Sequence, residues 1–170
     1  TNCTVAENTS KSSSSGAGSG GGIYAAGTLT MTGGAVTGNE AKSNGNGGGI
    51  YIGGAGSFTM TSGTVNNNKT EYGDGGIYSE GTLTMQGGTL TGNKAVNNKT
   101  GGGVYLKDGT FTMKGSSCVT PSTDNAKGNN DVYLANGKMI TVDGVLSPAG
   151  GIAARITVGF TQYLPTTQVL

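Results

Sequence analysis

Apolar and polar side chains alternate along four short stretches of the chain, which is the period of a β-strand and not of a helix. Residues 28–32 read Thr-Leu-Thr-Met-Thr, and the later stretches repeat this order with small changes. Their apolar positions are Leu29 with Met31, Phe58 with Met60, Leu83 with Met85, and Phe111 with Met113. Because successive side chains of a strand point to opposite faces, we expect the apolar set in a core and the Thr set on a surface.

Each alternating stretch follows a Gly-Gly–apolar–Tyr motif, and the whole unit repeats along the chain. The apolar residue before the Tyr recurs at intervals of 27, 27, 27 and 28 residues, at Ile23, Ile50, Ile77, Val104 and Val132. Self-similarity at a fixed period of this length indicates a solenoid. We therefore predict an all-β fold, a right-handed parallel β-helix of about six rungs, with a repeat of about 27 residues and three short strands per rung.

A second motif, which is an apolar residue, two small or polar residues and then Asn, ends the third predicted strand of successive rungs. It places four residues at equivalent positions, namely Asn8, Asn39, Asn68 and Asn93. Stacked rungs bring equivalent residues above one another, so we predict a ladder in which each amide bonds to the next and to turn backbone. Asn also tolerates left-handed backbone at little cost, which suits a turn. We interpret these residues as structural.

The repeats predict a single β-helix domain over residues 1–170. Residues 1–20 would form a partial first rung and a Ser/Gly-rich loop, 21–142 the regular repeats, and 143–170 an irregular last rung with a C-terminal cap. A cap is expected because an open solenoid end exposes both core and strand edges. Four polar loops are predicted to project from one edge, at residues 40–46, 68–74, 94–100 and 123–130. Because the chain begins with Thr1 and shows no signal-peptide pattern, we expect a processed product or a segment of a longer protein.

Composition agrees with short strands and narrows the classes of partner. Gly supplies 35 of the 170 residues, which disfavours helices because each interior Gly weakens a helix. The net charge is only +1, so no electrostatic case for nucleic-acid binding exists. No apolar run reaches the roughly 18 residues that a membrane helix needs, so we expect no membrane insertion of this segment.

The cysteines are too few for a disulfide framework, because Cys3 and Cys118 are the only two. In a solenoid they would lie about four rungs apart, which is on the order of 19 Å at a strand spacing of about 4.8 Å. Bridged Cα atoms lie within about 7 Å of each other. We therefore predict that these two residues are not bonded to each other.

The paired Gly-Gly-Ile-Tyr and Val-Thr-Gly-Asn elements resemble the right-handed parallel β-helix repeats of adhesin-like proteins on bacterial surfaces. They are similar in particular to the GGAI and FxxN motifs of chlamydial polymorphic outer membrane proteins. Gly48-Gly49-Ile50 and Gly75-Gly76-Ile77 match the first motif, and Asn39, Asn68 and Asn93 match the Asn of the second. The phenylalanine of the FxxN motif is replaced by Val or Leu in these repeats. The resemblance implies a secreted or surface-exposed bacterial protein used in adhesion or as a stalk.

Catalytic chemistry has little support in the sequence, although many parallel β-helices are polysaccharide lyases or hydrolases. Hydrolysis needs two carboxylates at a set separation, and the nine acidic residues here are scattered. Asp74 and Asp131 precede strands near one edge, and we expect them to be solvated turn residues. The chain has no His, and Arg155 is its only Arg. We predict no catalytic residue, metal site or cofactor, and we give no phosphate-binding role to the formal GxGxxG match at residues 16–21, because neither a strand before it nor a helix after it is predicted.

Two outward ladders remain as candidate binding surfaces. The first is a row of tyrosines at the rung spacing: Tyr24, Tyr51, Tyr78, Tyr105 and Tyr133. Exposed aromatic faces could stack on sugar rings or anchor a protein partner. Alternatively, the rings stack on each other and shield the strand face.

The second ladder consists of hydroxyl side chains: Thr28 with Thr30, Ser57 with Thr59, Thr82 with Thr84, and Thr110 with Thr112. Such an array resembles the regular hydroxyl and methyl lattice of some ice-binding β-solenoids, although Thr is also a common exposed strand residue.

These observations predict a non-enzymatic secreted or cell-surface module, an adhesin or structural spacer that meets a host or matrix glycan or protein through the Tyr face or the loop edge. The alternatives are an ice-binding protein that uses the Thr ladder and a carbohydrate-active lyase or hydrolase.

Overall fold

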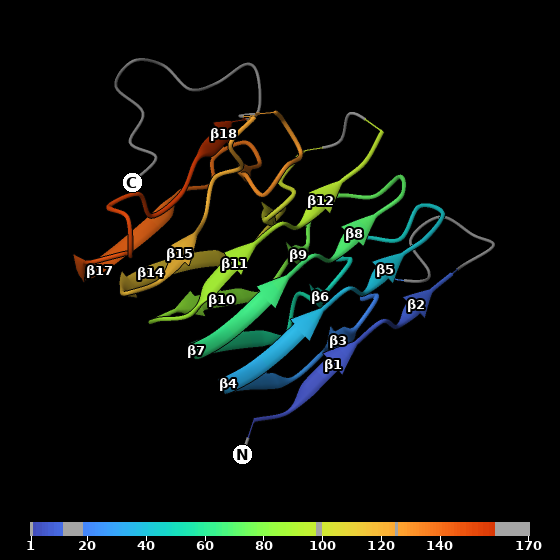
Figure 1. Cartoon of the computed structure of the whole chain (residues 1–170), viewed down its shortest axis with the longest axis horizontal. Helices are drawn as coiled ribbons and strands as arrows, with labels where there is room; N and C mark the ends of the chain where they lie inside the picture. The colour runs from blue at the N-terminus through green and yellow to red at the C-terminus, as the bar shows by residue number, and fades with distance from the viewer. Residues whose placement is uncertain (1, 12–18, 98–99, 125, 159–170) are drawn as a thin grey trace.

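A computed structural model describes residues 2–11, 19–97, 100–124 and 126–158. Within these ranges the chain is an all-β parallel solenoid of about five turns, slightly fewer than predicted, with no helix (Figure 1). Residues 159–170 of the predicted cap and residues 16–18 of the formal glycine motif lie outside the described residues.

The coil builds three parallel sheets; three successive turns contribute to all of them, and the later described turns add no strand to the third. In the first of these turns, β3 (Ile23–Ala25) leads into β4 (Thr28–Thr37) and then β5 (Glu40–Ala41). We name the sheets after their outward residues or length. The Tyr sheet is β3-β6-β9-β13-β16-β18, the Thr sheet contains β1, β4, β7, β10, β11, β14, β15 and β17, and the short sheet is β2-β5-β8-β12. The other strands are β1 (Thr4–Ala6), β2 (Thr9–Ser10), β6 (Ile50–Ile52), β7 (Ser57–Asn66), β8 (Lys69–Thr70), β9 (Ile77–Ser79), β10 (Thr82–Met85), β11 (Thr89–Thr91), β12 (Lys94–Ala95), β13 (Val104–Leu106), β14 (Thr110–Gly115), β15 (Cys118–Val119), β16 (Val132–Leu134), β17 (Ile140–Leu146) and β18 (Ile156–Val158).

The division into strands differs from the prediction in two ways. The second and third predicted strands of a rung are one bent strand in β4 and β7, and only later turns divide them. The bend in β4 includes Gly34, whose φ of 78° is left-handed and whose added Cβ would lie 2.0 Å from the Cys3 carbonyl oxygen. The short sheet was missed, because two-residue strands such as Glu40–Ala41 are too short to show a hydrophobic period.

The predicted alternation of core and surface positions is confirmed. Equivalent apolar side chains stack in register, as Phe58 pairs with Leu83 and Met60 with Met85. The largest fully buried side chains are Ile50, Ile52, Phe58, Met60, Ile77, Leu83, Met85, Leu90, Leu106, Phe111, Met113 and Leu134. They form one continuous core along the coil axis, so each turn depends on its neighbours for burial.

A ladder of buried amides closes the corner between the Thr sheet and the short sheet. The Asn39 side-chain N–H donates to Asn68 Oδ1 at 2.9 Å, and the Asn39 backbone N–H donates to the same oxygen at 3.0 Å. Asn68 repeats both bonds to Asn93 Oδ1 at 3.0 Å, and its second amide proton reaches the Val36 carbonyl at 2.9 Å. All of the hydrogen-bonding capacity of Asn68 is therefore used inside the protein.

At Asn8, Asn39, Asn68 and Asn93 the left-handed residue is not the ladder Asn but the residue before it, which corrects the expectation from sequence. These positions have φ values of 57° at Glu7, 65° at Gly38, 54° at Asn67 and 64° at Gly92. The strand therefore ends two residues before the ladder Asn, and the left-handed residue lies between them.

The sequence analysis missed the last member of the ladder, Asn130, which has a left-handed φ of 47°. Its Oδ1 accepts the side-chain N–H of Asn93 at 3.0 Å, and its own amide donates to the Leu90 carbonyl at 2.9 Å. It comes from the segment that leads into β16 and not from the end of a third strand. Its position two residues before Val132, where other repeats carry Gly, was the available signal.

The Gly-Gly motif and the Asn motif meet at this corner. A Cβ added to Gly49 would lie 2.8 Å from Asn68 Cγ, and one added to Gly22 would lie 2.9 Å from Asn39 Cγ. Real Cβ atoms do not approach that closely, so the amides of Asn39 and Asn68 occupy space that only Gly leaves open, and Gly76 does the same for Asn93. The two motifs, which lie far apart within one repeat, are therefore two halves of one packing arrangement.

This packing predicts different outcomes for two Gly-to-Ala substitutions. Gly49→Ala should lower the free energy of unfolding by about 1–3 kcal/mol, because the new methyl group displaces the Asn68 amide. Gly54→Ala should be neutral or slightly stabilising, because no atom lies within 4 Å of its added Cβ and its φ is not left-handed. Urea denaturation followed by circular dichroism measures both, and equal effects would contradict the assignment.

Candidate functional surfaces

The five ladder tyrosines lie on the outer face of the Tyr sheet and stack ring on ring. The strands hold Tyr24, Tyr51, Tyr78, Tyr105 and Tyr133 in register. Successive ring centroids are 5.1, 5.2, 5.2 and 4.7 Å apart, and the planes diverge by only 6–18°. This arrangement is the self-stacking alternative considered from the sequence.

Stacking reduces the area of the tyrosine rings that a binding partner could contact. Tyr78, in the middle of the ladder, is only 7 % exposed, whereas Tyr24 at its end is 60 % exposed. The faces of the inner rings are covered by neighbouring rings, so they do not form the expected row of exposed aromatic faces. The outer face of Tyr24 is the part of the ladder best placed to receive another ring.

Burial and nearby carboxylates shift the ionisation of the ladder. Burial raises the pKa of Tyr105 to about 12, with a smaller contribution from the negative charge of Asp74. Burial also raises the pKa of Tyr51, and the bond that its hydroxyl donates to Glu80 Oε2 at 2.8 Å adds to this shift. Burial likewise raises the pKa of Tyr78. The inner ladder therefore stays neutral well above neutral pH.

The predicted hydroxyl side chains lie in two columns on the outer face of the Thr sheet, which we call the Thr face. Backbone pairing aligns the first column as Thr28, Ser57, Thr82 and Thr110, and the second as Thr30, Thr59, Thr84, Thr112 and Thr141. Thr141 was not assigned to the array from the sequence, and its pairing with Thr112 places it there. Thr28, Thr30, Thr82 and Thr110 are exposed and Thr59, Thr84 and Thr112 half-buried, so both columns are accessible from one side.

A register shift and two ion pairs border the two columns of the Thr face. A register shift between Met31 and Thr32 pairs Thr32 with Ser62, so a third column does not continue. Lys114 forms an ion pair of 3.0 Å with Asp143 beside the array, and Lys138 pairs with Asp108 near its C-terminal end. The regular array therefore consists of two columns.

The structure corrects the expectation for one of the two acidic residues at the strand edge. Asp131 is fully buried and not solvated. Its Oδ1 accepts backbone N–H groups of Gly102 at 2.7 Å and Gly128 at 3.1 Å, and its Oδ2 accepts the Thr157 hydroxyl at 3.0 Å. These donors compensate for its burial, so the carboxylate fastens the last turn to the rest of the coil.

Neither cysteine forms a disulfide. Cys3 is exposed beside the first strand, whereas Cys118 is buried in β15. Cys118 Sγ lies 3.3 Å from the Ile152 carbonyl oxygen, which is consistent with a thiol that packs as part of the fold.

Three further observations bear on function. Over the described ranges, no group of three or more His, Cys, Asp or Glu side chains is arranged to hold a metal ion. The same part of the chain contains no helix long and apolar enough to span a membrane. Comparison with protein-family models, curated proteins and solved structures found no match to this chain.

The Tyr ladder predicts a loss of stability in alkaline solution. Unfolded tyrosines ionise near pH 10, whereas folded Tyr105 holds its proton until its pKa of about 12. The stabilisation from neutral Tyr105 should therefore be complete below pH 10 and disappear as pH rises to about 12. Tyr105→Phe, which keeps the stacked ring, should make the fall in unfolding free energy shallower. Urea denaturation across this pH range measures the slope, and identical slopes in both proteins would contradict the assignment.

Proposed function

We propose that this chain is a non-enzymatic module of a secreted or cell-surface bacterial protein, and that it acts as an adhesin or a rigid spacer. The observation that carries the proposal is the Thr face, where hydroxyl side chains recur in register from turn to turn. A repeated surface of this kind suits a partner that is itself repetitive or extended, such as an extracellular glycan or a matrix protein.

The same repetition supports the spacer role. Consecutive turns are joined by parallel backbone pairing, by the buried Asn amides and by stacked Tyr rings. Each contact involves only the neighbouring turn, so stiffness accumulates along the coil axis. Such a rod holds the Thr face in a fixed geometry without a ligand to organise it, which lowers the entropic penalty of binding.

Direct recognition through the Thr face fits its chemistry better than recognition through the Tyr ladder. Each Thr offers a hydroxyl that both donates and accepts hydrogen bonds, next to a methyl group that contacts apolar ring faces. The inner Tyr rings instead contact each other, and Tyr78 is buried. We therefore propose that the Thr face, and not the row of tyrosines, is the principal binding surface.

Binding of the purified protein to an array of glycans and matrix proteins tests this function. Thr59→Lys, in the middle of the Thr face, should weaken a saturable interaction by about tenfold or more, because the longer charged side chain holds the partner away from both columns. Thr91→Lys is the matched control, since Thr91 lies in β11, beyond the bend of the same sheet. Absence of saturable binding, or equal loss in both variants, would contradict recognition by the Thr face.

A second candidate function, ice binding, is favoured by the alignment of the two columns. Alternate residues along a strand lie about 7 Å apart and neighbouring strands about 4.8 Å apart, so the columns form a two-dimensional lattice of hydroxyl and methyl groups. A lattice of this kind can order water over its surface, whereas an irregular face cannot.

Inhibition of ice recrystallisation distinguishes this candidate from glycan binding. If the Thr face binds ice, the unmodified protein should keep ice grains small, and Thr59→Lys should abolish the effect while Thr91→Lys retains it. Grain growth equal to that in buffer with bovine serum albumin would rule this candidate out.

A further inference from the structure

At the N-terminal end of the coil, the outer edges of two sheets have no strand partner among the residues that the structure describes. β3 is the end strand of the Tyr sheet and pairs with β6 on its other side. β1 covers only the second half of β4, where Thr4, Val5 and Ala6 pair with Ala35, Val36 and Thr37. Among the described strands, none pairs with residues 23–25 or 28–31 on this side.

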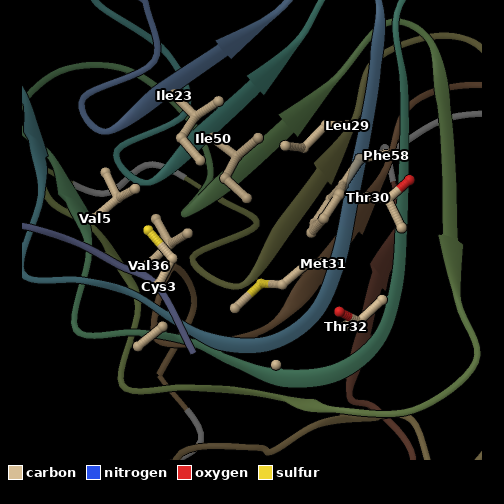
Figure 2. A pocket seen from close by; sticks show the side chains of 12 residues that line it. Cys3, Val5, Ile23, Leu29, Thr30, Met31, Thr32, Val36, Ile50 and Phe58 are labelled. Atoms are coloured by element: carbon tan, nitrogen blue, oxygen red, sulfur yellow. The ribbon is translucent and has the colours of Figure 1, made fainter. Parts of the chain in front are cut away.

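An apolar hollow of about 220 Å³ opens between these two edges. Figure 2 shows that the side chains of Ile23, Leu29 and Met31 point into it, while Thr30 and Thr32 point away toward the Thr face. Val5, Val36, Ile50 and Phe58 complete its apolar lining, and Cys3 lies at its margin.

The next turn shows what these residues lack. Ile50, Phe58 and Met60 are completely buried, whereas their equivalents one turn earlier are only half-buried. The two sets of residues occupy equivalent positions in register. They differ because Ile50, Phe58 and Met60 are covered by the preceding turn, whereas no described strand covers Ile23, Leu29 and Met31 in the same way. The hollow is the core of the coil seen from its uncovered end.

We propose that this end binds an extended segment of this chain's own repeat pattern, an apolar–Tyr strand followed, after a short turn, by a Thr–apolar–Thr–apolar strand. Such a segment would add one parallel strand to β3 and one to the first half of β4, in the register that every deeper turn repeats. Its apolar side chains would fill the hollow, and its Tyr would stack on the open face of Tyr24, as Tyr51 does on the other face. The proposal concerns the end of the coil and is independent of what the Thr face binds.

A repeat strand satisfies this surface better than a small apolar ligand. An apolar molecule in the hollow would leave the backbone edges of β3 and β4 without strand partners, and an exposed parallel edge is itself a template for pairing. The uncovered stretch also has a defined length, three residues in one sheet and four in the other, which β9 and β10 match as Ile77–Ser79 and Thr82–Met85.

A peptide with the sequence of residues 75–85 is therefore the probe, and the thiol of Cys3 is the reporter. Cys3 is exposed at the margin of the hollow and Cys118 is buried, so alkylation mapped by mass spectrometry separates them. The peptide should slow alkylation of Cys3 by about tenfold when about nine-tenths of the protein is occupied. A fluorescently labelled copy of the peptide should show saturable anisotropy.

Two matched pairs make the test specific. A peptide with Ile77→Ser and Leu83→Ser should give no protection, because it keeps the backbone but lacks the side chains for the hollow. The protein variant Leu29→Lys should lose binding, whereas Thr30→Lys, on the same strand but facing away from the hollow, should keep it, with circular dichroism confirming that both are folded.

Protection of Cys3 by both peptides, or no protection by the unchanged peptide although the protein is folded, would overturn the proposal. Concentration-dependent self-association that protects Cys3 and resists the peptide would overturn it in favour of a second copy as occupant.

Discussion

The structure depends on the contact between a ladder Asn and the second Gly of a repeat. Because Asn68 uses its whole amide inside the protein, it must lie deep in the corner of the coil. Because it lies there, the residue at position 49 has no room for a side chain. Replacing Asn68 leaves buried donors and acceptors without hydrogen bonds, and replacing Gly49 forces atoms together. Both changes destabilise a buried interior. The ladder thereby fixes the alignment of successive turns from Asn8 to Asn130.

Once the turns are aligned, the Tyr ladder and the Thr face form as a consequence of that alignment. The residue after each core Ile or Val lies directly above its equivalent, so five tyrosines stack at nearly constant distance. The same alignment turns isolated Thr residues into two columns. Stacking hides the inner Tyr rings while the Thr face stays open, so one geometric cause makes the first ladder mainly structural and the second the stronger candidate for binding.

Because the turns stack in one direction only, the sides of the coil and its ends differ in how well their residues are covered. The sides of the coil are closed by contacts that repeat at every turn, but an end has neighbours on one side only. At the N-terminal end this leaves Ile23, Leu29 and Met31 half-buried although their equivalents deeper in the coil are fully buried. The affinity we propose for a repeat strand is the same interaction that holds consecutive turns together, acting at the edge beyond which no described strand lies.

The sequence by itself determined the solenoid, its repeat length and the inward positions, because a strand alternates with period two and stacking imposes the period of the coil. It also identified Asn8, Asn39, Asn68 and Asn93 as one ladder. Only the tertiary structure decided that Asn130 completes this ladder, that Asp131 is buried, that Glu40–Ala41 belongs to a third sheet and that the Tyr faces are covered. These features depend on contacts between turns, about 25 to 40 residues apart in the chain, whose geometry no local pattern carries.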